Sequence, residues 1–191
     1  MQRCSTLAQF VFAGLGLTAT CTPAAASWSI GAEAGPARLD VICRAPSLSC
    51  DRRGSAAGLH GGYTLANGWG TRLAWQRARG FAGSDTTGSG PLGGSLRADT
   101  LSLAGTWRTR IAPFEAELRA GVASVDAEFT YRVGGSGTVS RRTTQPLVGA
   151  ALDWPLSNRF ALRLDLQATR AEVATTSGPL TTATVGLIAR F

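Results

Sequence analysis

Alternating apolar and polar residues recur in eight segments of this chain. In the last of them, residues 184–191, apolar side chains occupy every second position and the alternation ends on Phe191. A period of two places successive side chains on opposite faces of a β-strand, whereas a helical face repeats every 3.6 residues. The pattern predicts eight strands, at residues 27–35, 56–65, 69–79, 97–110, 114–126, 146–155, 160–171 and 181–191.

The connections between these segments alternate in length. Residues 66–68, 111–113 and 156–158 form tight turns, and Asn67-Gly68 is the strongest short hairpin signal among them. The other connections are long and rich in Gly, Ser, Thr and Arg, at residues 36–55, 80–96, 127–145 and 172–180. Short turns at one end and long loops at the other are typical of an up-and-down antiparallel barrel whose two termini lie on the short-turn side.

Charged residues of both signs occupy the same alternate positions, or parity, of the predicted strands, and so lie on one face. An arginine facing lipid would cost about 2–4 kcal/mol at the middle of a bilayer, whereas a narrow lumen can pair such charges. We therefore expect the polar parity to face inward, with glycines there leaving room for long side chains. The predicted lumen charge network consists of Glu33, Arg72, Arg108, Glu115, Glu117, Arg119, Asp153, Arg163 and Asp165. The inner glycines are Gly31, Gly58, Gly62, Gly70, Gly121, Gly149 and Gly186.

Aromatic residues gather near one end of the predicted strands, on the apolar parity. Amphipathic rings are favoured at a membrane interface, and a soluble barrel has no reason to place them around one rim. The alternative is a soluble barrel of the lipocalin kind, which holds apolar ligands inside and fits a charged interior poorly. The aromatic set is Trp28, Tyr63, Trp69, Trp107, Phe114, Trp154, Phe160 and Phe191.

Composition adds the domain organisation. The chain has 191 residues, 44% hydrophobic and 16% charged, which excludes a disordered protein. Residues 1–26 are predicted to be a cleaved secretory signal, with Arg3, an apolar core at 7–17 and alanines at 24–26. One barrel domain, residues 27–191, would remain. Beyond the N-terminus no run of about 20 apolar residues exists for a membrane-spanning helix.

Two cysteines, Cys43 and Cys50, would remain after the signal is removed. Exported proteins meet an oxidising environment, so we predict a disulfide between them. His60 is the single histidine, and no metal or cofactor site is predicted. The formal charge is +7, but the arginines are scattered, and we expect no nucleic-acid partner.

The final strand, residues 185–191, resembles the C-terminal sorting signal of Gram-negative outer-membrane proteins, with Phe191 as its terminal aromatic. Residues 27–191 resemble the small barrels of the outer-membrane protein A and outer-membrane protein X type. The resemblance implies an all-β, eight-stranded transmembrane barrel in the bacterial outer membrane, with short periplasmic turns and long extracellular loops. It also implies insertion by the barrel assembly machinery, contact with membrane lipid and lipopolysaccharide, and a monomer. We expect no peptidoglycan-binding domain of the kind that larger relatives carry.

Three classes of function remain. The preferred one is a structural or surface-interaction role in envelope integrity and adhesion, because charged loops are where such barrels carry function. A small pore is the second. A lipid-modifying enzyme is the third, but the strand of His60 offers no serine, so we predict no catalytic residue. Loop arginines could bind lipopolysaccharide phosphates or acidic or sulfated host polymers; they are Arg38, Arg44, Arg52, Arg53, Arg132, Arg141 and Arg142.

Overall fold

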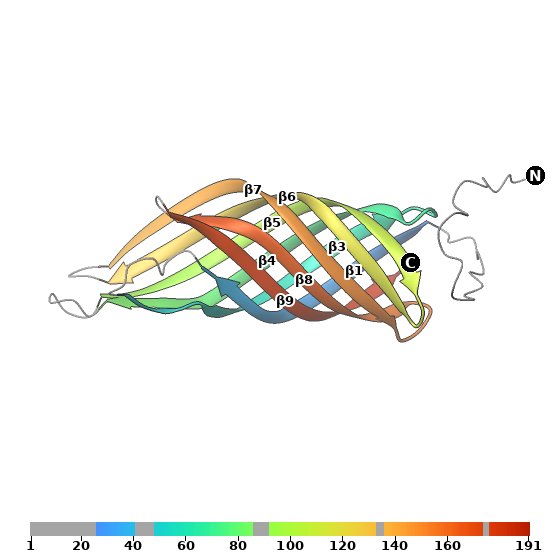
Figure 1. Cartoon of the computed structure of the whole chain (residues 1–191), viewed down its shortest axis with the longest axis horizontal. Helices are drawn as coiled ribbons and strands as arrows, with labels where there is room; N and C mark the ends of the chain where they lie inside the picture. The colour runs from blue at the N-terminus through green and yellow to red at the C-terminus, as the bar shows by residue number, and fades with distance from the viewer. Residues whose placement is uncertain (1–25, 41–47, 86–91, 133–135, 174–175) are drawn as a thin grey trace, which may run out of the picture.

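The computed structural model describes residues 26–40, 48–85, 92–132, 136–173 and 176–191. Eight strands among them form a closed antiparallel up-and-down barrel, in the order β4, β3, β1, β9, β8, β7, β6, β5 and back to β4 (Figure 1). A short strand, β2, pairs with the far end of β4. The strands are β1 (Ser27–Leu39), β2 (Leu48–Asp51), β3 (Arg53–Thr64), β4 (Trp69–Asp85), β5 (Leu92–Ile111), β6 (Phe114–Arg132), β7 (Ser136–Pro155), β8 (Phe160–Val173) and β9 (Thr176–Arg190).

The tight turns lie at one end of the barrel, which we call the turn end. Gly68 has a φ of 87° and its N–H bonds to the Leu65 carbonyl over 3.0 Å, so the predicted Asn67-Gly68 hairpin is confirmed. The first and last strands meet at the same end, where Trp28 and Phe191 exchange two backbone hydrogen bonds. This pairing closes the sheet and leaves no free edge between β1 and β9.

The strands continue further than their sequence pattern predicted. Much of the segments 36–55, 80–96, 127–145 and 172–180 is ladder rather than loop, at the opposite or loop end of the barrel. β6 and β7, for example, pair from Glu115 and Asp153 up to Arg132 and Ser136. Gly, Ser, Thr and Arg cover the outside of these extensions and resemble loop composition, while their inward positions carry apolar residues.

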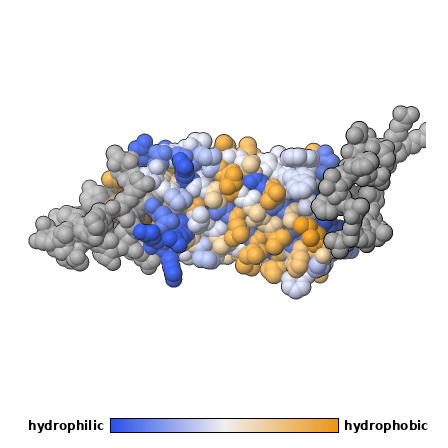
Figure 2. All heavy atoms as spheres, in the orientation of Figure 1, coloured by the Kyte–Doolittle hydropathy of each residue, from blue (hydrophilic) through white to orange (hydrophobic). Residues whose placement is uncertain are grey.

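The apolar parity faces outward around the turn-end half of the barrel. Leu103 is 56% exposed and Ile30 58% exposed, and the space-filling view shows such residues as one hydrophobic zone (Figure 2). We call this zone the apolar band. So much contiguous apolar surface is unfavourable in water and matches the hydrocarbon of a bilayer. The band includes Ile30, Leu59, Leu73, Leu101, Leu103, Leu118, Val122, Leu152, Leu164, Val185 and Leu187.

None of the described residues lie in a helix that is long and apolar enough to cross a membrane.

The barrel interior is built in two layers. Charged side chains fill the half nearer the turn end, and an apolar core fills the half nearer the loop end. The sequence analysis predicted only the charged layer. The apolar core comprises Ala37, Leu39, Ala56, Ala78, Phe81, Leu96, Ala98, Ala104, Ala123, Val125, Leu147, Ala171 and Leu180.

Candidate functional site

The charged layer of the lumen is built around Arg163 on β8. Its Nε and Nη2 donate to the two carboxylate oxygens of Asp153, over 2.7 and 3.0 Å. Its Nη1 and Nη2 donate to Glu117, over 3.1 and 2.8 Å. All three residues are at most 3% exposed. Paired and hydrogen-bonded charges of this kind are tolerated in an interior, whereas an isolated buried charge is not.

Two further arginines extend this cluster across the barrel. Arg119 on β6 makes a bidentate pair with Asp165 on β8. Arg72 on β4 donates to Asp165 over 3.2 Å and to both oxygens of Glu33 on β1, over 3.1 and 3.2 Å. The guanidinium of Arg72 therefore joins strands on opposite sides of the lumen.

The periphery of the cluster lies nearer the turn end. Arg108 donates to Glu117 over 2.7 Å, and Arg190 donates to Asp153 and lies 2.8 Å from Glu115. Five arginines and five carboxylates thus share the charged layer, so their formal charges cancel. All nine predicted lumen residues take part, joined by Arg190: Glu33, Arg72, Arg108, Glu115, Glu117, Arg119, Asp153, Arg163 and Asp165.

His60 also lies inside the barrel and is 5% exposed. Its Nδ1 is 3.6 Å from a carboxylate oxygen of Glu33. A cavity of about 10 Å³ beside it has room for no more than one water. Ser29 borders the same cavity, but its hydroxyl donates to the Gly62 carbonyl over 3.5 Å. A substrate the size of a lipid has no room at this histidine.

A second charged region lies on the outside of the barrel, between the apolar band and the loop end. We call it the arginine rim, and part of it forms the blue zone beside the hydrophobic one in Figure 2. Seven arginines and three acidic residues with described side chains form it, and Asp40 and Glu172 border it, so positive charge is in excess. The arginines are Arg38, Arg53, Arg77, Arg79, Arg97, Arg142 and Arg170, and the acids are Asp99, Asp126 and Glu128.

Register places the rim residues side by side. Arg77 pairs across the strands with Asp99, Asp99 with Asp126, and Asp126 with Arg142, so these four positions cross β4, β5, β6 and β7 at one level. Asp99 accepts hydrogen bonds from Arg77 over 2.6 Å and from Arg97 over 2.5 Å.

On the outer face of β4, Trp75 is the neighbour of Arg77 on the turn-end side. The Arg77 guanidinium stacks 5.1 Å from the centre of the Trp75 ring. An aromatic side chain between apolar and charged surface is typical of a membrane interface.

The structure places the predicted loop arginines in different parts of the chain. Arg38, Arg53, Arg141 and Arg142 lie on strands, and Arg52 lies between β2 and β3. Arg44 and Cys43 fall outside the described residues, so the Cys43–Cys50 disulfide stays a prediction. The signal prediction, residues 1–26, likewise falls almost entirely outside them.

Sequence reasoning missed most of the arginine rim. The sequence places Arg77, Arg79, Arg97 and Arg170 within predicted strands, and no role is predicted for them. A signal was present, because each lies on the same parity as the large apolar residues of its own strand and on their loop-end side. Counting outward positions from the turns would have placed all four on the loop-end side of the apolar band.

Solved structures with the same fold are outer-membrane barrels. Neisserial surface protein A has a TM-score of 0.64 at 12% identity, covering 88% of this chain and 100% of its own. A major outer membrane protein from Thermus thermophilus has a TM-score of 0.62 at 16% identity, with the same coverage of both chains. Ail, the attachment invasion locus protein of Yersinia pestis, has a TM-score of 0.60 at 17% identity, again with that coverage.

A further structure of Ail contains the heparin analogue sucrose octasulfate. No family model matches the chain, and no curated protein matches it in sequence. The fold is therefore that of the small eight-stranded outer-membrane β-barrels, as the sequence predicted.

Proposed function

We propose that this protein is a structural, surface-interacting barrel of the bacterial outer membrane, whose arginine rim binds the phosphates of lipopolysaccharide in the outer leaflet. The position of the rim carries the proposal. Its guanidinium groups lie on the lipid-facing side of the wall, directly beyond the apolar band. Arginine matches phosphate with paired donors, and each cationic side chain near an anionic membrane surface contributes about 1 kcal/mol.

The packed interior supports a structural role over a pore. The charged layer links β1, β4, β6, β7 and β8 through buried ion pairs, and the apolar core fills the barrel above it. An eight-stranded barrel is just wide enough for side chains to fill. His60 lacks room for a lipid substrate, so the proposal assigns no enzymatic activity.

Titration of the purified, detergent-solubilised protein with diphosphoryl lipid A tests the role of the rim. The double substitution Arg97→Gln with Arg142→Gln should weaken binding at least tenfold, and added salt should weaken it further. Arg110→Gln is the matched control, because this arginine is exposed at the turn end. Equal affinity for dephosphorylated lipid A would contradict the proposal. Tighter binding of sucrose octasulfate than of lipid phosphate would instead assign the rim to sulfated polymers.

Location and export belong to the same proposal. Cell fractionation should place the protein in the outer membrane, with a gel mobility that shifts on boiling. Sequencing of the mature N-terminus should find Ser27 first, and deletion of Phe191 should reduce assembly. A soluble protein with no mobility shift would overturn the assignment.

A further inference from the structure

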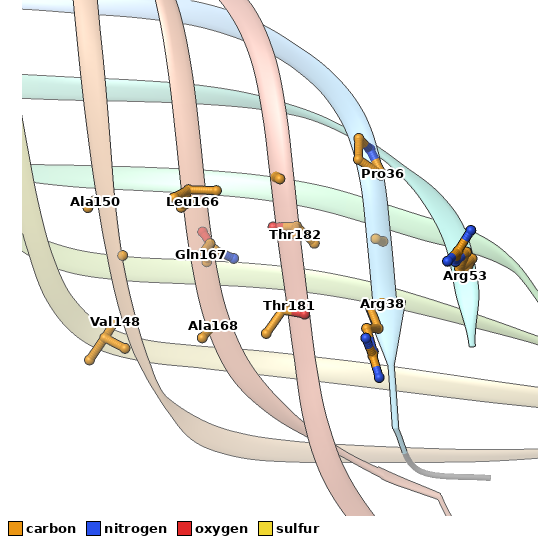
Figure 3. Close-up of a pocket in the computed structure, with 13 residues that line it drawn as sticks. Pro36, Arg38, Arg53, Val148, Ala150, Leu166, Gln167, Ala168, Thr181 and Thr182 are labelled. Carbon is orange, nitrogen blue, oxygen red and sulfur yellow. The ribbon is translucent and has the colours of Figure 1, made fainter. Parts of the chain in front are cut away.

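The outer wall of the barrel is hollowed where β7, β8, β9 and β1 run side by side. The hollow has a volume of about 850 Å³, and we call it the wall groove. Its floor is made by the small side chains Ala150, Ala168 and Ala183, with Leu166 standing between Ala150 and Ala183 and Val148 beside Ala168. Figure 3 shows the lining residues spread across these strands, from Val148 on β7 to Arg53 on β3.

Backbone features near the groove account for its shape. Among the described residues, the β7–β8 ladder ends at Val148 and Ala168, just before Pro146, which has no N–H to donate. The Thr169 hydroxyl donates instead to the Pro146 carbonyl over 2.9 Å. On the other side, Pro36 interrupts the ladder between β1 and β9. Two prolines and three outward alanines thus leave the wall thin and recessed here.

The two ends of the wall groove differ in polarity. Toward the turn end, the groove continues into the apolar band at Leu164 and Val185. Toward the loop end it is bordered by Arg38 and Arg53, which are cross-strand partners and belong to the arginine rim. Arg38 contacts Asp40, whose carboxylate also lies 3.3 Å from Arg52. By formal charge, the three arginines outnumber the one aspartate among these four residues.

From this polarity we infer that the wall groove is a specific binding site for one phosphorylated lipid. An acyl chain would lie over the alanine floor, and the phosphate would lie at Arg38 and Arg53. The inference rests on the proposed function, because it requires the rim to lie at the phosphate level of the outer leaflet. Charge complementarity selects the ligand. An uncharged chain would not match the positive charge at the loop end of the groove, and a free phosphate would leave the apolar groove exposed.

Filling the groove without changing any charge provides the test. Native mass spectrometry of the full mature barrel in detergent should show one retained molecule of diphosphoryl lipid A. Ala168→Phe and, independently, Ala183→Leu should each reduce that retained fraction at least fivefold. Ala116→Phe, an outer-facing alanine on β6 outside the groove, is the matched control and should retain lipid. The boiling shift verifies that each variant is folded.

The outcomes separate this inference from the proposed function. If Ala168→Phe and Ala183→Leu keep the lipid while Arg97→Gln with Arg142→Gln loses affinity, the groove proposal is wrong and the rim proposal stands. If none of these variants changes binding, both are wrong. Equal retention of dephosphorylated lipid A would overturn the phosphate position. A wild-type dimer that Ala168→Phe abolishes would show that a second copy, rather than lipid, occupies the groove.

Discussion

Arg72 on β4 donates a hydrogen bond to Asp165 on β8 over 3.2 Å, although 93 positions separate the two residues in the chain. The bond crosses the lumen and exists only because the sheet closes on itself. Both side chains are almost completely buried. The charged layer therefore ties opposite walls together as well as neighbouring strands.

Removal of Arg163 should be strongly destabilising. Arg163→Leu leaves the carboxylates of Glu117 and Asp153 buried without their main partner, and breaking a buried pair in this way costs about 3–5 kcal/mol. Urea unfolding followed by tryptophan fluorescence in detergent micelles measures the loss. Arg110→Gln is the control, because its pair with Glu115 is exposed and should contribute less than about 1 kcal/mol. Similar losses for both variants would contradict the role of burial.

The space created by an inner glycine can be tested with a single methyl group. A Cβ at Gly149 would lie 2.6 Å from the Arg119 Nε, so Gly149→Ala must displace a guanidinium that is bound to Asp165. Overpacking of this kind costs about 1–3 kcal/mol. Gly61→Ala is the matched control, because a Cβ there meets only the Ser29 carbonyl, at 3.9 Å. Equal thermal stability of the two variants would show that the space is not needed.

The apolar band should reject charge according to depth. Leu103 lies midway along β5 between the turn-end Trp107 and the rim residue Asp99, so Leu103→Arg should destabilise the barrel by about 2–4 kcal/mol in a bilayer. Ser95→Arg, also outward but beyond the rim on the same strand, should cost less than about 1 kcal/mol. Folding yield into lipid vesicles measures the difference. If the folding yield did not depend on the position of the introduced arginine, the membrane would lie elsewhere on the barrel.

The filled interior predicts that the wild-type barrel conducts little. Planar-bilayer recordings should lack large, stable conductance steps, because the charged layer and the apolar core both block the axis. Liposome swelling with small sugars should likewise be absent. A steady, large conductance from the purified protein would overturn the closed-lumen interpretation and favour the pore.

The alternation of residues determined the strands and the two faces of this protein. Period two is a local property, so Leu103 and Arg108 reveal their opposite sides without knowledge of the strand partner. The hairpin at Gly68 was equally local. The strand ends at the loop side were not, because Ser95 and Thr130 have the composition of a loop and become strand only through their cross-strand pairing.

The pairing of the buried charges and the shape of the outer wall arise from the closed barrel. The sequence placed Arg72 and Asp165 on the inner parity, but they become partners only because the barrel closes. Likewise, Ala168 and Ala183 are unremarkable in sequence, and they form a groove because β8 and β9 bring them together beside Pro36. Alternation is set by the geometry of a single strand, whereas contacts across the lumen and recesses in the wall depend on how eight strands close.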